Sequence, residues 1–401
     1  AAHDSGYHRV VLSSLPKTPP GTVLLHIGPA KTGSTAMQHA MFQVRDRLAE
    51  HGVHYVGSRP HEKEAGGIAL GLTRGAIGRR DPRPESWQRL VDEIATTALP
   101  RMVLSNEDFG RADEAAIDRI LAATGPERTH LVYVARRLDK VLPSHWQQQV
   151  KARMTSSYED FLREMLDPDA GTWRHQLVMD PQDVGAVLAR WGKVLPPERM
   201  TVVVAEEGNR EALPHAFERL LDLPTGLIAP PGGPANQSMG LAETEAVRRI
   251  NRLAIHEQWT PVEYRQLVQL GVVRALKNRA GGSGPRIGGV PRWAFDRVAE
   301  LADAQVDGIK ASGAHVIGDP ELLRVRGQVE PVTLPDEITA VDLDVLADVV
   351  SGFRTAAKRM KARKLAAAAP DVRLQRDKLG GRQLLQLLAR RTAARLGVRR
   401  G

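Results

Sequence analysis

The chain of 401 residues contains no cysteine. Disulfide bonds, thiolate zinc sites and cysteine nucleophiles are therefore excluded. Long apolar runs are also missing, because no stretch of about eighteen apolar residues occurs that could span a bilayer. The N-terminal segment lacks the cationic start and long apolar stretch of a secretory signal. These absences lead us to expect a cytoplasmic protein.

Acidic residues are scarce at the C-terminal end of the sequence. Residues 354–401 contain 15 Lys and Arg but only two acids, Asp371 and Asp377. This segment carries +13 while the whole chain has a formal net charge of +9, so the remaining residues carry −4. The basic excess is confined to a tail, and we expect no nucleic-acid partner for the main domain.

Short apolar segments typical of buried strands alternate with helical patterns in the first half of the chain. The predicted strands are Thr22–Gly28, Val53–Gly57, Met102–Ser105, His130–Ala135 and Thr201–Ala205. The predicted helices are Ser34–His51, Glu85–Leu99, Glu114–Ala123, Leu138–Arg153, Asp183–Val194 and Ala212–Leu221. Residues 58–84 are predicted to form a loop. The alternation predicts an α/β fold, in which helices flank a parallel sheet.

The pattern becomes mainly helical after a Pro- and Gly-rich stretch at residues 223–235. We therefore predict an N-terminal extension (residues 1–20), a main domain with a mainly helical C-terminal portion (21–350) and a basic helical tail (351–401). Ligands of parallel α/β sheets bind at the carboxyl ends of the strands. The motifs described next all follow such strand ends.

A dense cluster of anion-binding features follows the first strand, in the segment Gly28–Thr35 with the sequence GPAKTGST. Small residues let the backbone wrap closely around an anion, and the N–H groups that begin the next helix lack partners. Lys31 adds a full charge, and Ser34 and Thr35 add hydroxyl groups that suit a helix N-cap. The segment predicts a phosphate-binding loop. A plain turn with Lys31 in solvent is the alternative.

The order of residues in this loop differs from that of the Walker motif. In that motif Lys directly follows a Gly and precedes Ser or Thr, whereas here Lys31 stands two residues before Gly33. The lysine is therefore expected beside the terminal group of a ligand, and the missing magnesium ligand argues against nucleotide hydrolysis. Lys31-Thr32-Gly33 also resembles a β-lactamase triplet, but here it follows a strand, and Pro16 spoils the helical Ser-x-x-Lys of those enzymes.

A second candidate anchor follows the strand His130–Ala135. Arg136 stands at the strand end, and Ser144 comes eight residues later, two helical turns along the next segment. A guanidinium group and a hydroxyl group both donate to phosphate, and this spacing lets them meet over one site. Taken alone, a capping arginine and a solvated serine are the simpler interpretation.

Together the two segments resemble the signatures of the sulfotransferase superfamily that uses 3′-phosphoadenosine 5′-phosphosulfate (PAPS). The family's Pro-Lys-x-Gly-Thr/Ser-Thr loop is similar to Pro29–Thr35, with one extra residue between Pro and Lys. Its strand-end Arg with Ser eight residues later is similar to Arg136 and Ser144. The segment Met200–Leu223 also looks like a later strand of the family's sheet, so the likeness covers roughly Thr22–Leu241.

The resemblance implies a P-loop-like fold, PAPS as the sulfuryl donor, adenosine 3′,5′-bisphosphate as the product and no required metal. It also implies roles for single residues. Lys31 would stabilise charge on the bridging oxygen. The 3′-phosphate would be held by Arg136 and Ser144. The 5′-phosphosulfate would be held by Lys31, Thr32, Gly33, Ser34 and Thr35.

An acceptor hydroxyl or amine must lose its proton to a base. Glu107 is the best candidate, because it directly follows the strand Met102–Ser105. Many family members use His or Glu for this role, and in the cytosolic members a His stands where this chain has Asn106 or Glu107. Asp108 is the runner-up. The alternative is that Glu107 caps a turn or pairs with an arginine.

Other residues have weaker claims. Asn236–Ser238 and Arg286 lie in late loops that reach the nucleotide in members of this family. Segment 382–396 resembles a basic amphipathic helix that can lie on an anionic membrane, but Arg391 and Arg395 fall on its leucine side, so a solvated or partner-packed helix is preferred. Side chains interpreted as structural are Trp146, Trp191, His54 and His145.

The predicted function is sulfuryl transfer from PAPS to a hydroxyl or amine of a small-molecule, lipid or carbohydrate acceptor. The alternatives are a P-loop small-molecule kinase and a non-catalytic binding module. The position of Lys31 argues against the kinase. The joint presence of Lys31, Arg136, Ser144 and an acidic residue argues against the binding module. Segments 58–84 and 155–180 are expected to shape the acceptor pocket.

Overall fold

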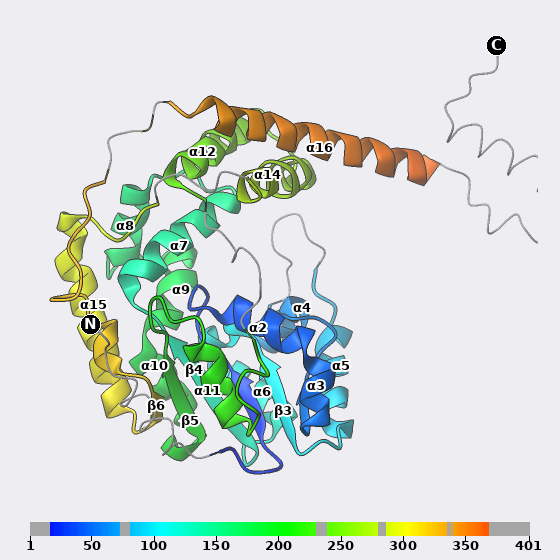
Figure 1. Cartoon of the computed structure of the whole chain (residues 1–401), viewed down its shortest axis with the longest axis vertical. Coiled ribbons are helices and arrows are strands. Elements are labelled where there is room, and N and C mark those ends of the chain that lie inside the picture. Colours follow the sequence, from blue (N-terminus) through cyan, green and yellow to red (C-terminus); the bar gives the residue numbers. More distant parts are fainter. Residues whose placement is uncertain are drawn as a thin grey trace, which may run out of the picture.

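The computed structural model describes residues 17–72, 81–229, 239–279, 286–334, 338 and 340–368 (Figure 1). Most of the predicted N-terminal extension, the segment Asn236–Ser238 and the basic segment 382–396 lie outside these residues. Within the described residues, no helix combines the length and the apolar character that a bilayer crossing needs.

The centre of the molecule is a sheet of six strands in the order β2-β3-β1-β4-β5-β6. All neighbouring strands pair in parallel. The sheet therefore confirms the predicted α/β class with a parallel sheet flanked by helices. Its strands are β1 (Val23–His26), β2 (Val53–Tyr55), β3 (Arg101–Ser105), β4 (Thr129–Ala135), β5 (Met200–Val204) and β6 (His315–Ile317).

Residues that alternate along the strands are buried against helices on opposite faces of the sheet. Leu24 packs on one face and Leu25 on the other, and both are fully buried. One face is covered by α2 (Ser34–Gln43), α3 (Arg45–Glu50) and α11 (Ala212–Leu220). The other is covered by α4 (Lys63–Ala69), α5 (Glu85–Thr96), α6 (Glu114–Thr124), α10 (Val184–Trp191) and α15 (Arg292–Ala311). Burial on both faces explains why the strands are continuous apolar runs.

A mainly helical portion follows the sheet, as predicted, and has a core of its own (Figure 1). Helix α7 (Leu138–Lys151) follows β4 and packs in the helical core, where its Trp146 is fully buried, whereas Trp191 is fully buried against the sheet. Both tryptophans are therefore structural, as predicted. The helices of this portion are α7 (Leu138–Lys151), α8 (Tyr158–Leu166), α9 (Trp173–Met179), α12 (Leu241–His256), α13 (Pro261–Tyr264), the π-helix η4 (Arg265–Val272), α14 (Val273–Lys277) and α16 (Leu343–Ala368).

Where helix α16 crosses η4, the backbones of the two helices are in direct contact. A Cβ atom on Gly352 would lie 2.6 Å from Val272 Cα, and one on Gly271 would lie 2.8 Å from the Gly352 carbonyl oxygen. Only glycine allows two helices to approach so closely without displacement. Because α16 runs through residue 351, the helical portion and the predicted tail share one continuous helix.

Three local predictions were wrong. The segment 58–84, predicted as a loop, contains α4, whose two glycines weaken its helical signal while its Ala65 and Ala69 are fully buried against the sheet. The helix predicted at Ser34–His51 is broken at Val44 into α2 and α3. Strand β6 was missed, because three residues give too short a pattern to stand out.

Candidate active site at the carboxyl edge of the sheet

The candidate residues gather where the order of the sheet reverses. From β1 the chain continues to β2 and β3 on one side, and then returns to β4 on the other side of β1. The loops after β1 and β4 therefore face a crevice outside the carboxyl edge, which is where open α/β sheets bind ligands. Lys31 follows β1 and Arg136 follows β4, whereas Glu107 follows β3.

The phosphate loop has two residues in the left-handed backbone region. Lys31 has φ 76° and Gly33 has φ 104°. The left-handed conformation costs little for glycine but is uncommon for lysine, and such strain is typical of functional loops. Gly33 is the N-cap of α2, and no side chain caps this helix. The prediction that Ser34 or Thr35 suits the N-cap was therefore wrong, because both residues lie inside the helix.

Five consecutive backbone N–H groups of this loop have no acceptor among the described residues. They belong to residues 31–35, whereas the next two amides, of Ala36 and Met37, both donate to the Gly33 carbonyl oxygen at 3.0 and 3.2 Å. The exposed positions Gly33 and Thr35 leave part of this surface open to solvent. Unpartnered amides at a helix start attract an anion, because they add to the positive end of the helix dipole.

A buried chain of hydrogen bonds connects the phosphate loop to the ends of β1 and β3. His26 at the end of β1 contacts Ser105 Oγ of β3 through Nδ1 at 2.7 Å and Ser34 Oγ through Nε2 at 3.3 Å. Thr32 Oγ1 lies 3.0 Å from Ser34 Oγ and donates to the Pro29 carbonyl oxygen at 2.8 Å. Burial, aided by the nearby His61, lowers the pKa of His26 to about 3, so the ring is neutral. The hydroxyls of Thr32 and Ser34 thus order the loop.

The Lys31 side chain points from the loop toward α7. Its Nζ donates to Gln148 Oε1 at 3.2 Å. Burial lowers the pKa of Lys31 from its usual value, the carboxylate of Glu107 opposes this shift, and neighbouring cations reinforce it. The ammonium group therefore lies within electrostatic reach of the candidate base.

Arg136 fixes the backbone of the same loop. Its Nη1 donates to the Lys31 carbonyl oxygen at 2.8 Å, and its Nε and Nη2 hold the two carboxylate oxygens of Glu207 at 2.6 and 3.0 Å. These contacts use three of the five N–H groups of a guanidinium, which leaves one on each terminal nitrogen. Glu207, which follows β5, was not predicted as part of the site.

Ser144 is half-buried on α7 and makes no side-chain hydrogen bond within the part of the chain that the structure describes. It lies four residues before Gln148, and residues at this spacing share one helix face. Lys31, which contacts Gln148, therefore lies close to the face of α7 that carries Ser144. The structure thus brings Arg136 into direct contact with the phosphate loop, whereas Ser144 lies one helical turn from Gln148, the residue that Lys31 contacts.

Glu107 begins the short 3-10 helix η1 (Glu107–Arg111). The cap of this helix is Asn106, whose Oδ1 accepts from the Asp108 amide at 3.0 Å, and the arginine partner Arg111 binds Asp108 instead. The interpretation of Glu107 as a cap or an arginine partner was therefore wrong. Its side chain is only 10% exposed, and its Oε2 has no hydrogen-bond partner among the described residues. Burial raises the pKa of Glu107, whereas the nearby His61 opposes the shift.

His61 is the part of the site that the sequence did not reveal. It precedes α4, its Nε2 donates to Asn106 Oδ1 at 3.0 Å, and its Nδ1 lies 4.0 Å from Glu107 Oε1. Helix α4 approaches this closely because Gly66 has no side chain, since a Cβ atom there would lie 1.8 Å from Asn106 Nδ2. A glycine in a segment without helical pattern gives no sequence signal for this contact.

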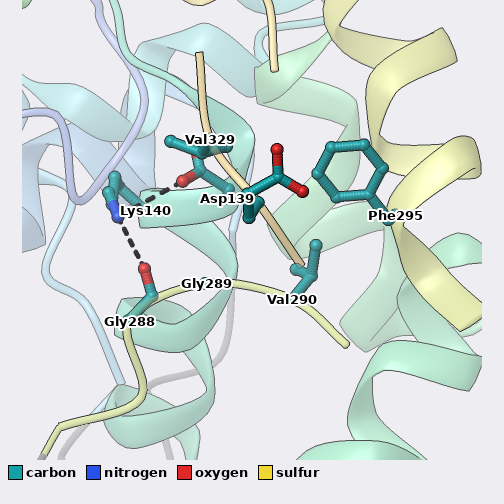
Figure 2. A pocket seen from close by; sticks show the side chains of 8 residues that line it. Asp139, Lys140, Gly288, Gly289, Val290, Phe295 and Val329 are labelled. Atoms are coloured by element: carbon teal, nitrogen blue, oxygen red, sulfur yellow. Dashed lines mark hydrogen bonds and ion pairs between the residues drawn. The ribbon is translucent and has the colours of Figure 1, made fainter. Parts of the chain in front are cut away.

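Three other candidates have separate surroundings. His54 Nε2 contacts Glu93 Oε1 at 2.8 Å, and His145 is buried against the Ala30 backbone, which supports a structural role for both. Arg286 is exposed. Two residues after it, the Gly288 carbonyl oxygen accepts a hydrogen bond from Lys140 Nζ, near the start of α7, at 2.5 Å. Figure 2 shows this contact at a pocket of about 250 Å³.

Among the comparisons with known proteins, only the comparison with solved structures finds matches. No protein-family model matches the chain, and no curated protein matches it. Nine chains among the solved structures match. One is a sulfotransferase from Alicyclobacillus acidocaldarius, with 13% identity, a TM-score of 0.36 and an alignment that covers 60% of this chain and 93% of that one.

Proposed function

We propose that this protein is a sulfotransferase that takes its sulfuryl group from PAPS and transfers it to a hydroxyl or amine of an acceptor. The observation that carries the proposal is the row of five unpartnered amides at residues 31–35, with Lys31 beside it. Such a row fits the 5′-phosphosulfate end of the donor. The two remaining N–H groups of Arg136 and the hydroxyl of Ser144 fit its 3′-phosphate.

In the proposed reaction, the acceptor atom attacks the sulfur in line with the bridging oxygen. The bond between sulfur and that oxygen breaks, and its electron pair leaves with adenosine 3′,5′-bisphosphate. The proton of the acceptor passes to Glu107, whose pKa burial has raised toward the working range of a general base. Lys31 stabilises the charge that develops on the bridging oxygen. The chemistry requires no metal.

His61 acts in this proposal through Glu107. Its Nε2 donates to Asn106 Oδ1, so its Nδ1 faces the carboxyl group of Glu107 at 4.0 Å. A neutral imidazole in that place accepts hydrogen bonds, whereas a protonated one favours the ionised form of Glu107. His61 is therefore a positioning residue that adjusts how readily Glu107 takes a proton.

Calorimetric titration with adenosine 3′,5′-bisphosphate tests the donor site. The wild type is expected to bind at tens of micromolar or tighter, and Lys31→Ala at least about tenfold more weakly, which corresponds to about 1.4 kcal/mol. Lys310→Ala is the matched control, because Lys310 pairs with Glu321 away from the loop. Absence of binding by the wild type would overturn the proposal. Tighter binding of ATP with magnesium than of the bisphosphate would instead favour the kinase alternative.

A further inference from the structure

Two lysines near the site, Lys151 and Lys277, are not among the residues proposed to bind the donor. Lys151 is the last residue of α7, and Lys277 is the last residue of α14. On α7, Ser144, Gln148 and Lys151 are spaced by four and three residues, so they share one face. Because Gln148 contacts the Lys31 ammonium, Lys151 lies one turn beyond that contact. We call Lys31, Lys151 and Lys277 the lysine cluster.

The end of α7 is held in place by the helical portion. Gln269 Nε2 of η4 donates to the Lys151 carbonyl oxygen at 2.9 Å, and Tyr264 Oη lies 3.4 Å from the same oxygen. Helix α14, which carries Lys277, continues directly from η4. Lys151 and Lys277 are both half-buried. The two lysines are thus presented by packed helices.

Lys151 and Lys277 have no counter-charge within the described residues, whereas Lys31 has the Glu107 carboxylate within electrostatic reach. None of the three ammonium groups forms an ion pair with a described carboxylate. Arg279, only two residues beyond Lys277, differs sharply, because it contacts Glu243 at 3.4 Å and Asp348 at 3.5 Å. Burial, reinforced by Lys31 and Lys277, lowers the pKa of Lys151 to about 7. Helix C-termini favour a cation, but this effect explains neither the burial nor the clustering.

The position of the cluster separates it from the donor's 3′-phosphate. Helix α7 begins just after Arg136 and rises about 1.5 Å per residue, so Lys151 lies roughly 20 Å along the axis from the helix start. On the same face of α7, the Lys31 ammonium contacts Gln148, which lies between the proposed 3′-phosphate ligand Ser144 and Lys151. Lys151 therefore lies past the Lys31 contact, on the side away from Ser144. In Figure 1, α14 lies above α2 and α4, on the side of the carboxyl edge.

We propose that Lys151 and Lys277 bind an anionic group of the acceptor, namely a carboxylate, a sulfate ester or a phosphate ester, so that the acceptor is an acidic molecule. This inference rests on the proposed sulfotransferase function. An ammonium pair gives point charges without fixed direction, which suits any of these tetrahedral or planar anions. Binding there would relieve the repulsion within the lysine cluster and place the acceptor hydroxyl or amine between Lys31 and Glu107.

Competitive acetylation tests the inference without a known acceptor. The enzyme is first saturated with adenosine 3′,5′-bisphosphate, so that the phosphate loop is occupied. It is then labelled with acetic anhydride at pH 7 in sodium sulfate or in sodium chloride of equal ionic strength, and each lysine is quantified by mass spectrometry. We expect sulfate to reduce labelling of Lys151 and Lys277 severalfold and to leave Lys310 unchanged, because Lys310 is paired with Glu321.

Two results would overturn the inference. Equal labelling of Lys151 and Lys277 in sulfate and chloride would mean that no anion binds them. Protection of both lysines by the bisphosphate alone, with no further effect of sulfate, would assign them to the donor. If the bisphosphate does not bind at all, the donor proposal fails separately. The sulfate effect on Lys151 and Lys277, measured on the free enzyme, then still reports on the lysine cluster.

Single variants add a second readout. Lys151→Ala is expected to raise the sulfate concentration that half-protects Lys277 about tenfold, and Lys277→Ala is expected to do the same for Lys151. Neither change should alter the dissociation constant of the bisphosphate by more than about twofold, and Lys310→Ala should alter neither quantity. A large loss of bisphosphate binding in Lys151→Ala would contradict the inference.

Discussion

The two ends of helix α7 carry positive charge in opposite ways. At the start, Arg136 holds Glu207 with two hydrogen bonds, and Arg137 holds Asp139 at 2.7 and 3.0 Å. At the end, Lys151 faces no carboxylate among the described residues. A paired guanidinium is fixed in place and orders the backbone around it, whereas an unpaired ammonium remains available to a ligand. At the first end, the contacts of Arg136 order the phosphate loop and leave two of its N–H groups unused, whereas at the second end the whole ammonium group of Lys151 is without an ion-pair partner among the described residues.

The largest expected effect concerns the chemistry between these two ends. Glu107→Gln removes the proposed base but keeps its size, so turnover should fall about 10²- to 10⁴-fold while bisphosphate affinity and sulfate protection stay unchanged. Steady-state kinetics, calorimetry and acetylation measure the three quantities. The matched control is Asp108→Asn, which should change turnover only a few-fold. Unchanged turnover in Glu107→Gln would remove this residue from the mechanism, and a large loss in Asp108→Asn would make Asp108 the base.

Arg136→Ala tests the role of the positive charge at the start of α7. This change removes the hydrogen bond to the Lys31 carbonyl oxygen and leaves the Glu207 carboxylate without its partner beside the phosphate loop. We expect the bisphosphate to bind about 10- to 100-fold more weakly, since charge-assisted contacts are among the stronger ones. Calorimetry measures the loss. Arg324→Ala, in an ion-pair network near α15, is the control. Equal affinity of the Arg136 variant and the wild type would show that the charge at this end does not serve the donor.

A smaller effect is expected from His61→Asn. His61 opposes the rise in the pKa of Glu107, so its loss should raise that pKa further. The base works only when ionised, and turnover therefore falls as pH drops through this pKa. The acid limb of kcat should shift to higher pH by up to about one unit, with a few-fold loss at pH 7. His54→Asn, which removes only the contact to Glu93, should leave the limb in place. An unshifted limb in His61→Asn would separate His61 from the base.

The fourth expectation concerns stability, and its effect on turnover is the smallest. Burial lowers the pKa of His26 to about 3, of His130 to about 4 and of His145 to about 3. The unfolded chain therefore binds about three more protons than the folded chain between these values and the usual 6.5, and folding stability is lost as pH falls through this range. The slope near pH 5 should be on the order of 4 kcal/mol per pH unit.

Denaturant unfolding at pH 7, 6 and 5 measures this slope. His26→Asn should flatten it by about a third, because one of the three protonation steps is removed. His256→Asn is a suitable control, since His256 is exposed at the end of α12, away from the three buried rings. A stability that does not change between pH 7 and 5 would mean that the ring beneath the phosphate loop is not held neutral.

Local sequence patterns predicted where the candidate residues that follow strand ends lie in the fold. Lys31, Arg136 and Glu107 each follow an apolar run, and parallel strands bring such ends to one edge. His61, Lys151 and Lys277 could not be predicted in this way, because their places depend on how helices pack. Helix α4 carries no helical pattern, and α14 is positioned by η4 and α16. Short elements such as β6 were missed for a similar reason, since they are stabilised by their neighbours.

The contact between α16 and η4 determines the orientation of α14. At Gly271 and Gly352 the two helices touch through their backbones, so even a single methyl group would act as a wedge between them. Such a wedge would turn α14 and carry Lys277 with it, while leaving the phosphate loop on the sheet untouched. On the proposed role of Lys277, substitutions at this remote contact would change acceptor preference without altering Lys31 or Glu107.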